Sequence, residues 1–142
     1  MDTSLHELVR RTFATLEAMD LEAMMCLFAE DAVLIDPHFP TPQMQGKAVI
    51  SEGFRGAMRG MRSFGYTIVN YCESENGQCA AVETATHHVL KQGKKLDFPQ
   101  VFIFETANGY ITRLQAYEPY GPHGMVGFFL SVGRFIKKVS RK

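Results

Sequence analysis

The first half of the chain repeats its apolar residues with the period of an α-helix. Apolar positions recur every three or four residues near the N-terminus, which predicts an amphipathic helix over residues 4–19. Asp20 is expected to cap a second helix over residues 21–28, and Gly46 precedes a third helix over residues 47–59. A short apolar run and a proline-rich loop separate the second helix from the third.

The second half changes to the pattern of β-strands. Four segments are rich in β-branched and aromatic residues, and Asn-Gly or Gln-Gly pairs typical of hairpin turns separate them. The expected strands cover residues 66–71, 79–90, 96–105 and 110–118. Three helices followed by hairpin-connected strands predict an α+β fold, in which the N-terminal helices pack on a strongly bent antiparallel sheet. Residues 1–142 are predicted to form a single domain.

The C-terminal segment, residues 124–142, predicts a last helix. It combines large apolar residues with a basic end made of Lys137, Lys138, Arg141 and Lys142. Such a helix could dock on the sheet, complete a dimer or touch a membrane surface. Packing on the sheet needs no further partner and is the simplest of the three interpretations.

Composition narrows the class of function. The chain has 15 basic and 15 acidic residues, so no long-range field favours a nucleic acid or an acidic substrate. No apolar run approaches the ~18 residues of a membrane-spanning helix, and the start of the chain lacks the apolar block of a secretory signal, so we expect a cytoplasmic location. Cys26, Cys72 and Cys79 lack metal-ligand spacing and are expected to be reduced. No metal or other cofactor is predicted.

Asp36 is the main candidate for chemistry. It ends a short apolar run and precedes Pro37, which favours extended geometry at the residue before it. Ile35 and Phe39 offer an apolar wall, where desolvation would raise the pKa of a carboxyl group. Asp36 is therefore either a tuned acid or base in a pocket or a former of the turn before the proline. His38 is expected at the mouth of such a pocket or in solvent.

Two stretches resemble the nuclear transport factor 2 superfamily. They are residues 20–37, DLEAMMCLFAEDAVLIDP, and residues 109–117, GYITRLQAY, within a similarity that runs from residue 8 to residue 120. The superfamily includes ketosteroid isomerases, limonene epoxide hydrolases and SnoaL-like polyketide cyclases, and the chain resembles its SnoaL-like and ketosteroid isomerase-like branch. The resemblance implies a cone-shaped α+β barrel. It does not specify the activity, because this scaffold hosts many chemistries.

In the isomerases the Asp before the Pro is the catalytic base, and Asp36 occupies that position here. An isomerase also needs donors to the enolate oxygen, which in ketosteroid isomerase are a Tyr and a protonated Asp. By motif, the Tyr position falls on Phe13, which has no hydroxyl, and the Asp position falls on Gln100, whose amide can still donate. These changes are expected to lower the rate of steroid isomerisation by on the order of 10² or more. A cyclase-like proton transfer requires fewer catalytic groups, namely one acid or base beside a pocket that fits the ligand.

The epoxide hydrolases need an Asp–Arg–Asp set. The positions of its Arg and first Asp map onto Glu83 and Ala85, and the second Asp maps onto Ala116, so the set is missing. The same match points Glu83, Ala85 and His87 into the cavity. It leaves His88 on the opposite face of the strand, toward water or a partner subunit.

The sequence does not settle which face of the last hairpin points into the cavity. A two-residue turn pairs even positions with odd ones, whereas placing Gln100 and Ala116 in one cavity needs a loop with an odd number of residues. A slip of one residue would instead place Gln115 and Tyr117 inside. Glu118 is either a second acid at the rim or the end of the strand.

Two functions follow from these observations. In the first, a small apolar or polycyclic carbonyl compound binds in the cone, Asp36 transfers a proton, and Gln100 or His87 polarises an oxygen. In the second, the chain is a non-catalytic ligand-binding or assembly module. The resemblance also implies a homodimer through the outer face of the sheet. The predicted pocket lining consists of Phe13, Phe28, His38, Phe54, Met58, Glu83, Phe98, Phe102, Leu114, Ala116 and Glu118.

Overall fold

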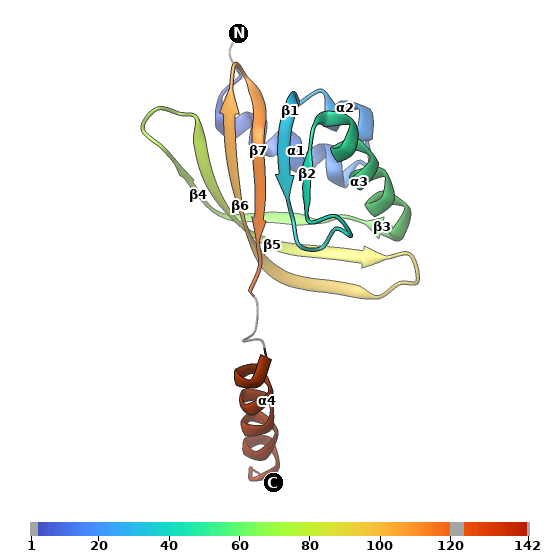
Figure 1. Ribbon diagram of the computed structural model, residues 1–142, viewed down its shortest axis with the longest axis vertical. Helices are drawn as coiled ribbons and strands as arrows, with labels where there is room; N and C mark the ends of the chain where they lie inside the picture. Colours follow the sequence, from blue (N-terminus) through green and yellow to red (C-terminus); the bar gives the residue numbers. More distant parts are fainter. Residues whose placement is uncertain (1–2, 120–123, 142) are drawn as a thin grey trace.

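The computed structural model describes residues 3–119 and 124–141. Tyr120, where the predicted resemblance ends, and Lys142 of the basic end lie outside the described residues. The elements follow in the order α1 (Leu5–Glu17), α2 (Leu21–Met25), β1 (Phe28–Ile35), β2 (Gln43–Gln45), α3 (Lys47–Gly60), β3 (Met61–Ser63), β4 (Tyr66–Glu73), β5 (Cys79–Leu90), β6 (Lys95–Ala107), β7 (Tyr110–Tyr117) and α4 (Gly124–Val139) (Figure 1).

The N-terminal helices begin where local capping allows. Ser4 caps α1 by accepting a hydrogen bond from the Glu7 amide at 3.2 Å, and Asp20 caps α2 by accepting one from the Ala23 amide at 2.9 Å. The prediction that α2 continues to Phe28 is wrong, because the helix ends at Met25 and Phe28 begins β1. Phe28 is buried there against the core rather than at a cavity.

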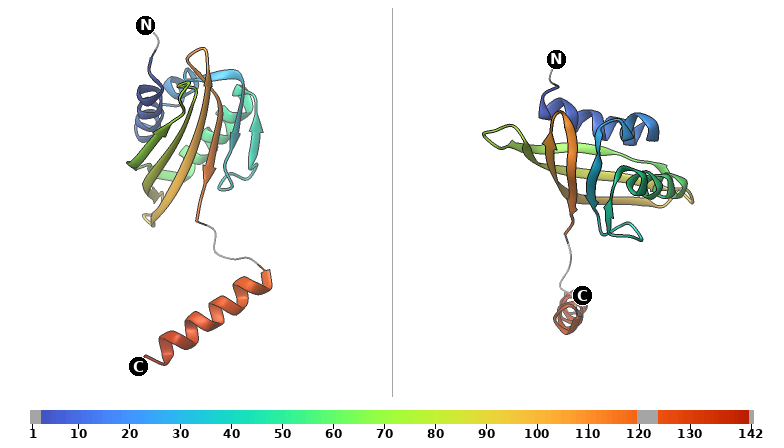
Figure 2. Two further views of the ribbon diagram at one scale, coloured as in Figure 1. Left: turned by 90° about the vertical axis from the view of Figure 1, so that its left-hand side faces the viewer. Right: turned by 45° about the horizontal axis from the view of Figure 1, so that its top comes forward.

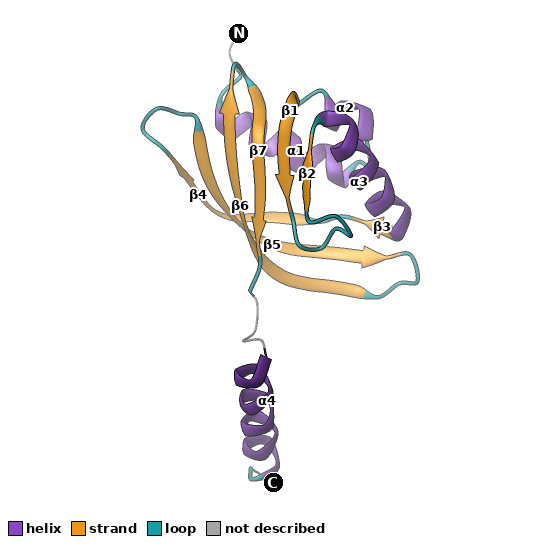
Figure 3. Ribbon diagram, in the orientation of Figure 1, coloured by secondary structure: helices purple, strands orange, loops and turns teal. Residues whose placement is uncertain are grey.

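The sheet is strongly curved and has the strand order β2-β1-β7-β6-β5-β3, with β4 also paired to β5. Strands β4 to β7 pair antiparallel in sequence order, as predicted. The N-terminal strand β1 pairs parallel with β7, and this strand pair joins the two halves of the chain within one sheet. Helices α1 to α3 lie on the concave side of this open sheet (Figures 2 and 3). The predicted α+β cone is therefore confirmed.

A β-bulge settles the face of the last hairpin. The turn has two residues, Asn108 and Gly109, both with positive φ, and Ala107 faces Tyr110. One position further on, the register shifts, so that Glu105 faces Arg113 and the even positions of both strands come to lie on one face. Gln100 and Ala116 therefore share the inner face without an odd loop.

The core lies between α1 and the inner faces of β5, β6 and β7. The ring of Phe13 packs edge-on against Phe102 and Phe104, with centroids 5.3 and 6.0 Å apart. Phe104 is fully buried. Burial of large apolar side chains of this kind contributes roughly 1.5–3 kcal/mol each and holds the helices on the sheet.

Helix α4 stands apart from residues 3–119, which we call the α+β body (Figure 1). Its large apolar side chains are exposed, from 39% for Val132 to 77% for Met125. The expectation that this helix packs on the sheet is therefore wrong. Among the described residues, no helix is long and apolar enough to cross a membrane.

Candidate functional site

Asp36 is held at the start of the loop that joins β1 to β2. Its backbone amide donates to the Pro42 carbonyl at 2.9 Å, which closes the loop. Its carboxylate Oδ1 accepts a hydrogen bond from the His38 amide at 2.9 Å, the side-chain turn that Asp commonly makes. The side chain is 13% exposed and borders a cavity. Asp36 thus combines the two roles that the sequence left open, a turn former and an acid at a pocket.

The cavity is about 260 Å³ in volume and lies between the helices and the inner face of the sheet. Nine of the fourteen predicted site residues line it, and most of the wall is apolar. They are Phe13, Asp36, His38, Phe54, Phe98, Gln100, Phe102, Leu114 and Ala116. The volume lies slightly below the ~300–1,000 Å³ of typical small-molecule sites. The cavity therefore suits a compact, mostly apolar ligand.

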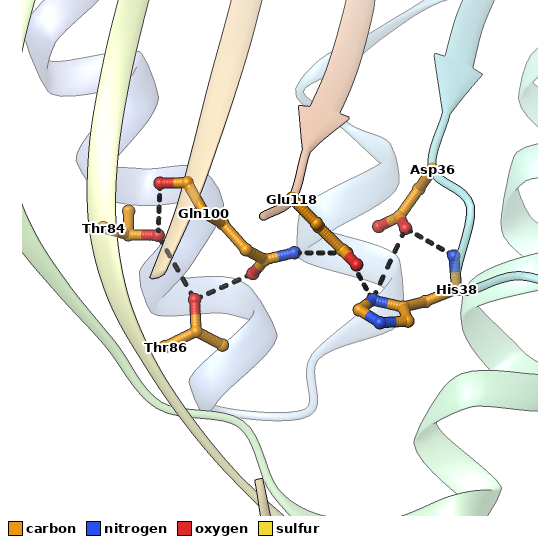
Figure 4. Close-up of polar contacts among 6 residues, drawn as sticks. All are labelled: Asp36, His38, Thr84, Thr86, Gln100 and Glu118. Atoms are coloured by element: carbon orange, nitrogen blue, oxygen red, sulfur yellow. Dashed lines mark hydrogen bonds and ion pairs between the residues drawn. The ribbon is translucent and has the colours of Figure 1, made fainter. Parts of the chain in front are cut away.

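A chain of polar contacts runs from the buried strands to the mouth of this cavity (Figure 4). The Thr86 hydroxyl donates to Gln100 Oε1 at 2.8 Å, and Gln100 Nε2 donates to Glu118 Oε1 at 2.9 Å. Glu118 in turn contacts Nδ1 of His38. Gln100 is buried and both ends of its amide are engaged, so it holds Glu118 in place.

His38 lies between two acids at the mouth. Its Nδ1 is 3.9 Å from Asp36 Oδ1 and also contacts Glu118, while its ring packs edge-on against Phe98 at 5.3 Å. The side chain is 55% exposed, so it connects the buried carboxylates with solvent. Contrary to the prediction, Glu118 is not among the residues that line the cavity, but its contacts with His38 and Gln100 make it part of the site, directly after the last residue of β7.

Burial raises the pKa of Asp36, and the amide and charge of His38 oppose this rise. Burial also raises the pKa of Glu118, and the charge of Asp36 raises it further, against His38 and the Gln100 amide. Both carboxyl groups therefore hold a proton more readily than in water. Such acids are suited to taking up and returning a proton.

The same three side chains could also hold a metal ion. Asp36, His38 and Glu118 each offer one ligand atom, and these atoms lie within 4.8 Å of one another. Two carboxylates with one imidazole are a donor set that divalent cations accept. Any test of proton transfer at this site therefore needs a chelator control.

Four predicted site residues lie elsewhere. His87 and Glu83 point to the outer face of β5, where His87 pairs with Asp97 at 2.9 Å and Glu83 accepts from Asn70 at 2.6 Å. Met58 is partly buried on α3 outside the cavity, and Phe28 is in the core. The predictions for His87 and Glu83 are wrong because the loop after β5 shifts the pairing.

That loop has three residues and ends at Gly93, which has a φ of +91°. Leu90 therefore pairs with Lys94, and even positions of β5 face even positions of β6. Thr84, Thr86 and His88 thus lie on the inner face, opposite to the assignment made from the sequence. The charged Glu83 among the odd positions was the available signal for an outward face.

Two polar cavity residues, Tyr66 and His88, were missed: His88 because of this loop, and Tyr66, at the start of β4, because the sequence did not single it out. Both line the cavity, and their rings pack edge-on with centroids 5.0 Å apart. The Gly65 amide donates to His88 Nδ1 at 3.3 Å, so a neutral His88 carries its proton on Nε2. Burial, assisted by the charges of His38 and His87, lowers the pKa of His88 to about 4. Burial and the charges of Asp36 and Glu17 raise the pKa of Tyr66, so it keeps its hydroxyl proton.

Replacing His88 with Asn is expected to reduce the pH dependence of stability on the acid side. Between the ordinary pKa of 6.5 and about 4, the unfolded chain binds a proton at His88 that the folded chain does not. The free energy of unfolding therefore falls as the pH decreases through this range, by on the order of 3 kcal/mol from this group. Urea unfolding of wild type and variant across that range measures the difference.

The matched control is His87→Asn, which changes the exposed neighbour on the other face. Asp36 and Glu118, whose raised pKa values act in the opposite sense, are present in all three proteins and cancel in the comparison. Equal pH slopes for wild type and His88→Asn would contradict the burial of a neutral His88.

Comparisons with known proteins agree with this architecture. The family model of the SnoaL-like domain matches residues 9–114. No curated protein matches the sequence.

Among solved structures, a Mycobacterium tuberculosis protein in complex with estradiol-17beta-hemisuccinate is 20% identical, with a TM-score of 0.73 over 81% of this chain and 94% of that one. The Delta 5-3-ketosteroid isomerase from Mycobacterium sp. is also 20% identical, with a TM-score of 0.73 over 81% of this chain and 93% of that one. A computationally designed 17-OHP binder gives the same identity, score and coverage as the isomerase. At such identities the likeness establishes the fold alone.

Proposed function

Since the chain belongs to the SnoaL-like domain family, we propose that it binds a small, largely apolar carbonyl compound and catalyses proton transfer of the isomerase or cyclase type, with Asp36 as the base. The observation that carries this proposal is the position of Asp36, a desolvated carboxyl group in the wall of an apolar cavity. A base whose pKa is raised toward neutrality takes a proton from carbon more effectively than an ordinary aspartate.

The geometry of the carboxylate supports this role. Oδ1 is fixed by the His38 amide, and no hydrogen bond to Oδ2 is formed within residues 3–119 and 124–141. Oδ2 is then the atom that accepts the proton from the carbon next to the ligand carbonyl. His38, with Nδ1 at 3.9 Å from Oδ1, is placed to exchange that proton with solvent or with Glu118.

Two neutral donors would stabilise the enolate oxygen. Tyr66 and His88 both line the cavity, each has one proton to donate, and burial keeps each group uncharged at neutral pH. These residues replace the polarising role that the sequence suggested for Gln100 and His87. Gln100 instead positions Glu118, and His87 lies on the outer face.

The class of ligand is argued from the wall and from the relatives. Aromatic rings line much of the cavity, which favours a flat, ring-containing compound. One of the similar structures is a complex with a steroid ester, and another is a designed 17-OHP binder, which suggests a polycyclic ligand here as well. The volume of about 260 Å³ favours a compact member of that class.

The second candidate is a binding module without catalysis. The observation that favours it is the hydrogen bond of Asp36 Oδ1 to the loop, which gives the residue a structural use independent of chemistry. In this case the cavity holds the same class of ligand, and the carboxyl group only shapes the loop at its mouth.

The experiment that separates the two measures exchange of α-protons in D₂O by NMR. A bicyclic and a steroidal β,γ-unsaturated ketone serve as probes, and binding is followed in parallel by ligand-detected NMR. Wild type is expected to bind at least one ketone and to accelerate its exchange above the buffer rate, with and without EDTA. Binding without exchange would favour the second candidate, and a loss of exchange in EDTA would favour a metal at the acid cluster.

We also retain two expectations as proposals, a cytoplasmic location and a homodimer through the outer face of the sheet. That face carries the His87–Asp97 and Glu83–Asn70 pairs, which are compatible with a polar interface.

A further inference from the structure

Helix α4 has an exposed apolar face that the α+β body does not cover. Phe128, Val132, Phe135 and Val139 follow one another at four- and three-residue spacings, and Ile136 lies beside them. At 3.6 residues per turn these side chains fall within about 120° of the helix circumference. Phe128 and Phe135 are 66% and 68% exposed, and Ile136 is 57% exposed. An apolar stripe of this size is normally covered.

The C-terminal half of α4 is cationic on the opposite face. Arg134, Lys137 and Lys138 lie on the side of the helix away from the stripe, and Arg141 follows just after the helix ends at Val139. All 15 acidic residues of the chain precede residue 124, while five of its 15 basic residues follow it. The segment therefore combines a concentrated apolar face with positive charge that no acid in the same helix neutralises.

We propose that α4 binds the surface of a membrane containing anionic phospholipids. A helix that is apolar on one face and rich in Lys and Arg on the other lies in the plane of the interface, with its apolar side chains at the boundary of headgroups and acyl chains. Its cations then contact lipid phosphates. The helix lies on the surface rather than crossing it, consistent with its length and charge.

A second copy of α4 fits these charges less well than a lipid surface. Two such helices packed along their apolar stripes would cover the stripes but leave the cations of both helices on the outside with no acid to neutralise them, because residues 124–142 hold no Asp or Glu. An anionic bilayer supplies both the apolar medium and the negative charge. The charge pattern therefore favours an anionic membrane over a second copy of α4 as the partner of the apolar stripe.

The attachment of α4 places this surface near the cavity. Glu118 contacts His38 at the mouth of the cavity, and five residues separate Glu118 from Gly124, where α4 begins. Even a fully extended link of this length spans no more than about 22 Å. Helix α4 also lies on the side of the body where β1 and β7 end (Figure 1). If the proposed function holds, the membrane would present apolar ligands close to the cavity mouth; the binding of lipid does not depend on it.

Sedimentation of the full chain with vesicles tests the proposal. We expect it to bind vesicles of equal parts phosphatidylcholine and phosphatidylglycerol, and to bind pure phosphatidylcholine much more weakly. Each basic residue near an anionic surface contributes about fivefold to partitioning, so Lys137→Glu with Lys138→Glu should weaken binding at least about 25-fold. Phe128→Ser with Phe135→Ser should weaken binding to both kinds of vesicle.

The matched control is Lys94→Glu with Lys95→Glu, two exposed lysines at the turn between β5 and β6, which alters the net charge equally and should leave binding nearly unchanged. Equal binding of the Lys137/Lys138 variant and wild type, or no binding to anionic vesicles, would overturn the proposal. Gel filtration tests the alternative, a dimer formed through α4. That alternative would hold if wild type is a dimer that does not bind vesicles and the Phe128/Phe135 variant is a monomer.

A failure here is distinguishable from a failure of the proposed function. The α4 variants leave the cavity wall intact, so their α-proton exchange in solution should equal that of wild type. A midpoint of thermal unfolding equal to that of wild type would show that the variants are folded.

Discussion

Replacing Asp36 with Asn is expected to lower the rate of α-proton exchange by about 10²–10⁴-fold, the usual contribution of a positioned general base. Asn has nearly the same shape, and its side-chain oxygen can accept the His38 amide hydrogen bond that Oδ1 accepts now. The loop should therefore persist while the base is lost. Because the ligand is largely apolar, its affinity should change little, and NMR titration measures this alongside exchange.

The pH profile of exchange gives an independent sign of the same base. The rate should rise with pH as Asp36 loses its proton, with a midpoint above the ordinary 3.8 because burial raises the pKa of this group. The Asn variant should lack this rise. Glu118 and His38 also face Asp36, so a rise that persists in the variant would transfer the role of base to one of them.

Asp97→Asn is the matched control for this experiment. Asp97 is also a carboxylate paired with a histidine, at 2.9 Å from His87, but it is 63% exposed on the outer face. Exchange should be unchanged in this variant. An Asp36→Asn protein that exchanges α-protons within about threefold of wild type would refute catalysis by Asp36, since a base of ordinary effect contributes at least ~10²-fold.

Phe104→Ala is expected to lower the free energy of unfolding by about 3–5 kcal/mol, the range for removing a fully buried aromatic ring. Phe104 has no exposed surface, and its ring packs against Phe13 of α1. It also faces Ala80 and Leu114 on the neighbouring strands, so the lost volume lies where two strands and a helix meet. Urea denaturation of the two proteins measures the difference.

Phe128→Ala provides the control, since this ring is 66% exposed on α4. A surface substitution of this kind should change stability by no more than about 0.5 kcal/mol. Equal destabilisation by the two changes would mean that α4 packs on the α+β body. A loss below about 1.5 kcal/mol for Phe104→Ala would mean that the core refills the space.

Several features of this protein could be predicted from local sequence. Asp20 caps α2 as expected, and Asn108-Gly109 forms the tight turn that its residue types favour. Asp36 before Pro37 indicated both its turn and its place at a cavity. These features depend on contacts within a few residues, and the residue types alone specify such contacts.

The inward faces of the strands and the polar groups of the site were decided by the tertiary structure. A three-residue loop at Gly93 set the pairing of β5, and a bulge set that of β7, so His88 faces the cavity and His87 does not. The meeting of His38 with Glu118, 80 positions apart in sequence, depends on β1 pairing with β7 across the whole chain.

The physical reason is the two-residue period of a strand. One added or missing residue in a turn moves every side chain of the following strand to the other face. Where both faces mix polar and apolar residues, the hydrophobic pattern of the sequence does not reveal that shift. Local chemistry thus determined the elements and the acid at the end of β1. Long-range pairing decided which groups that acid meets.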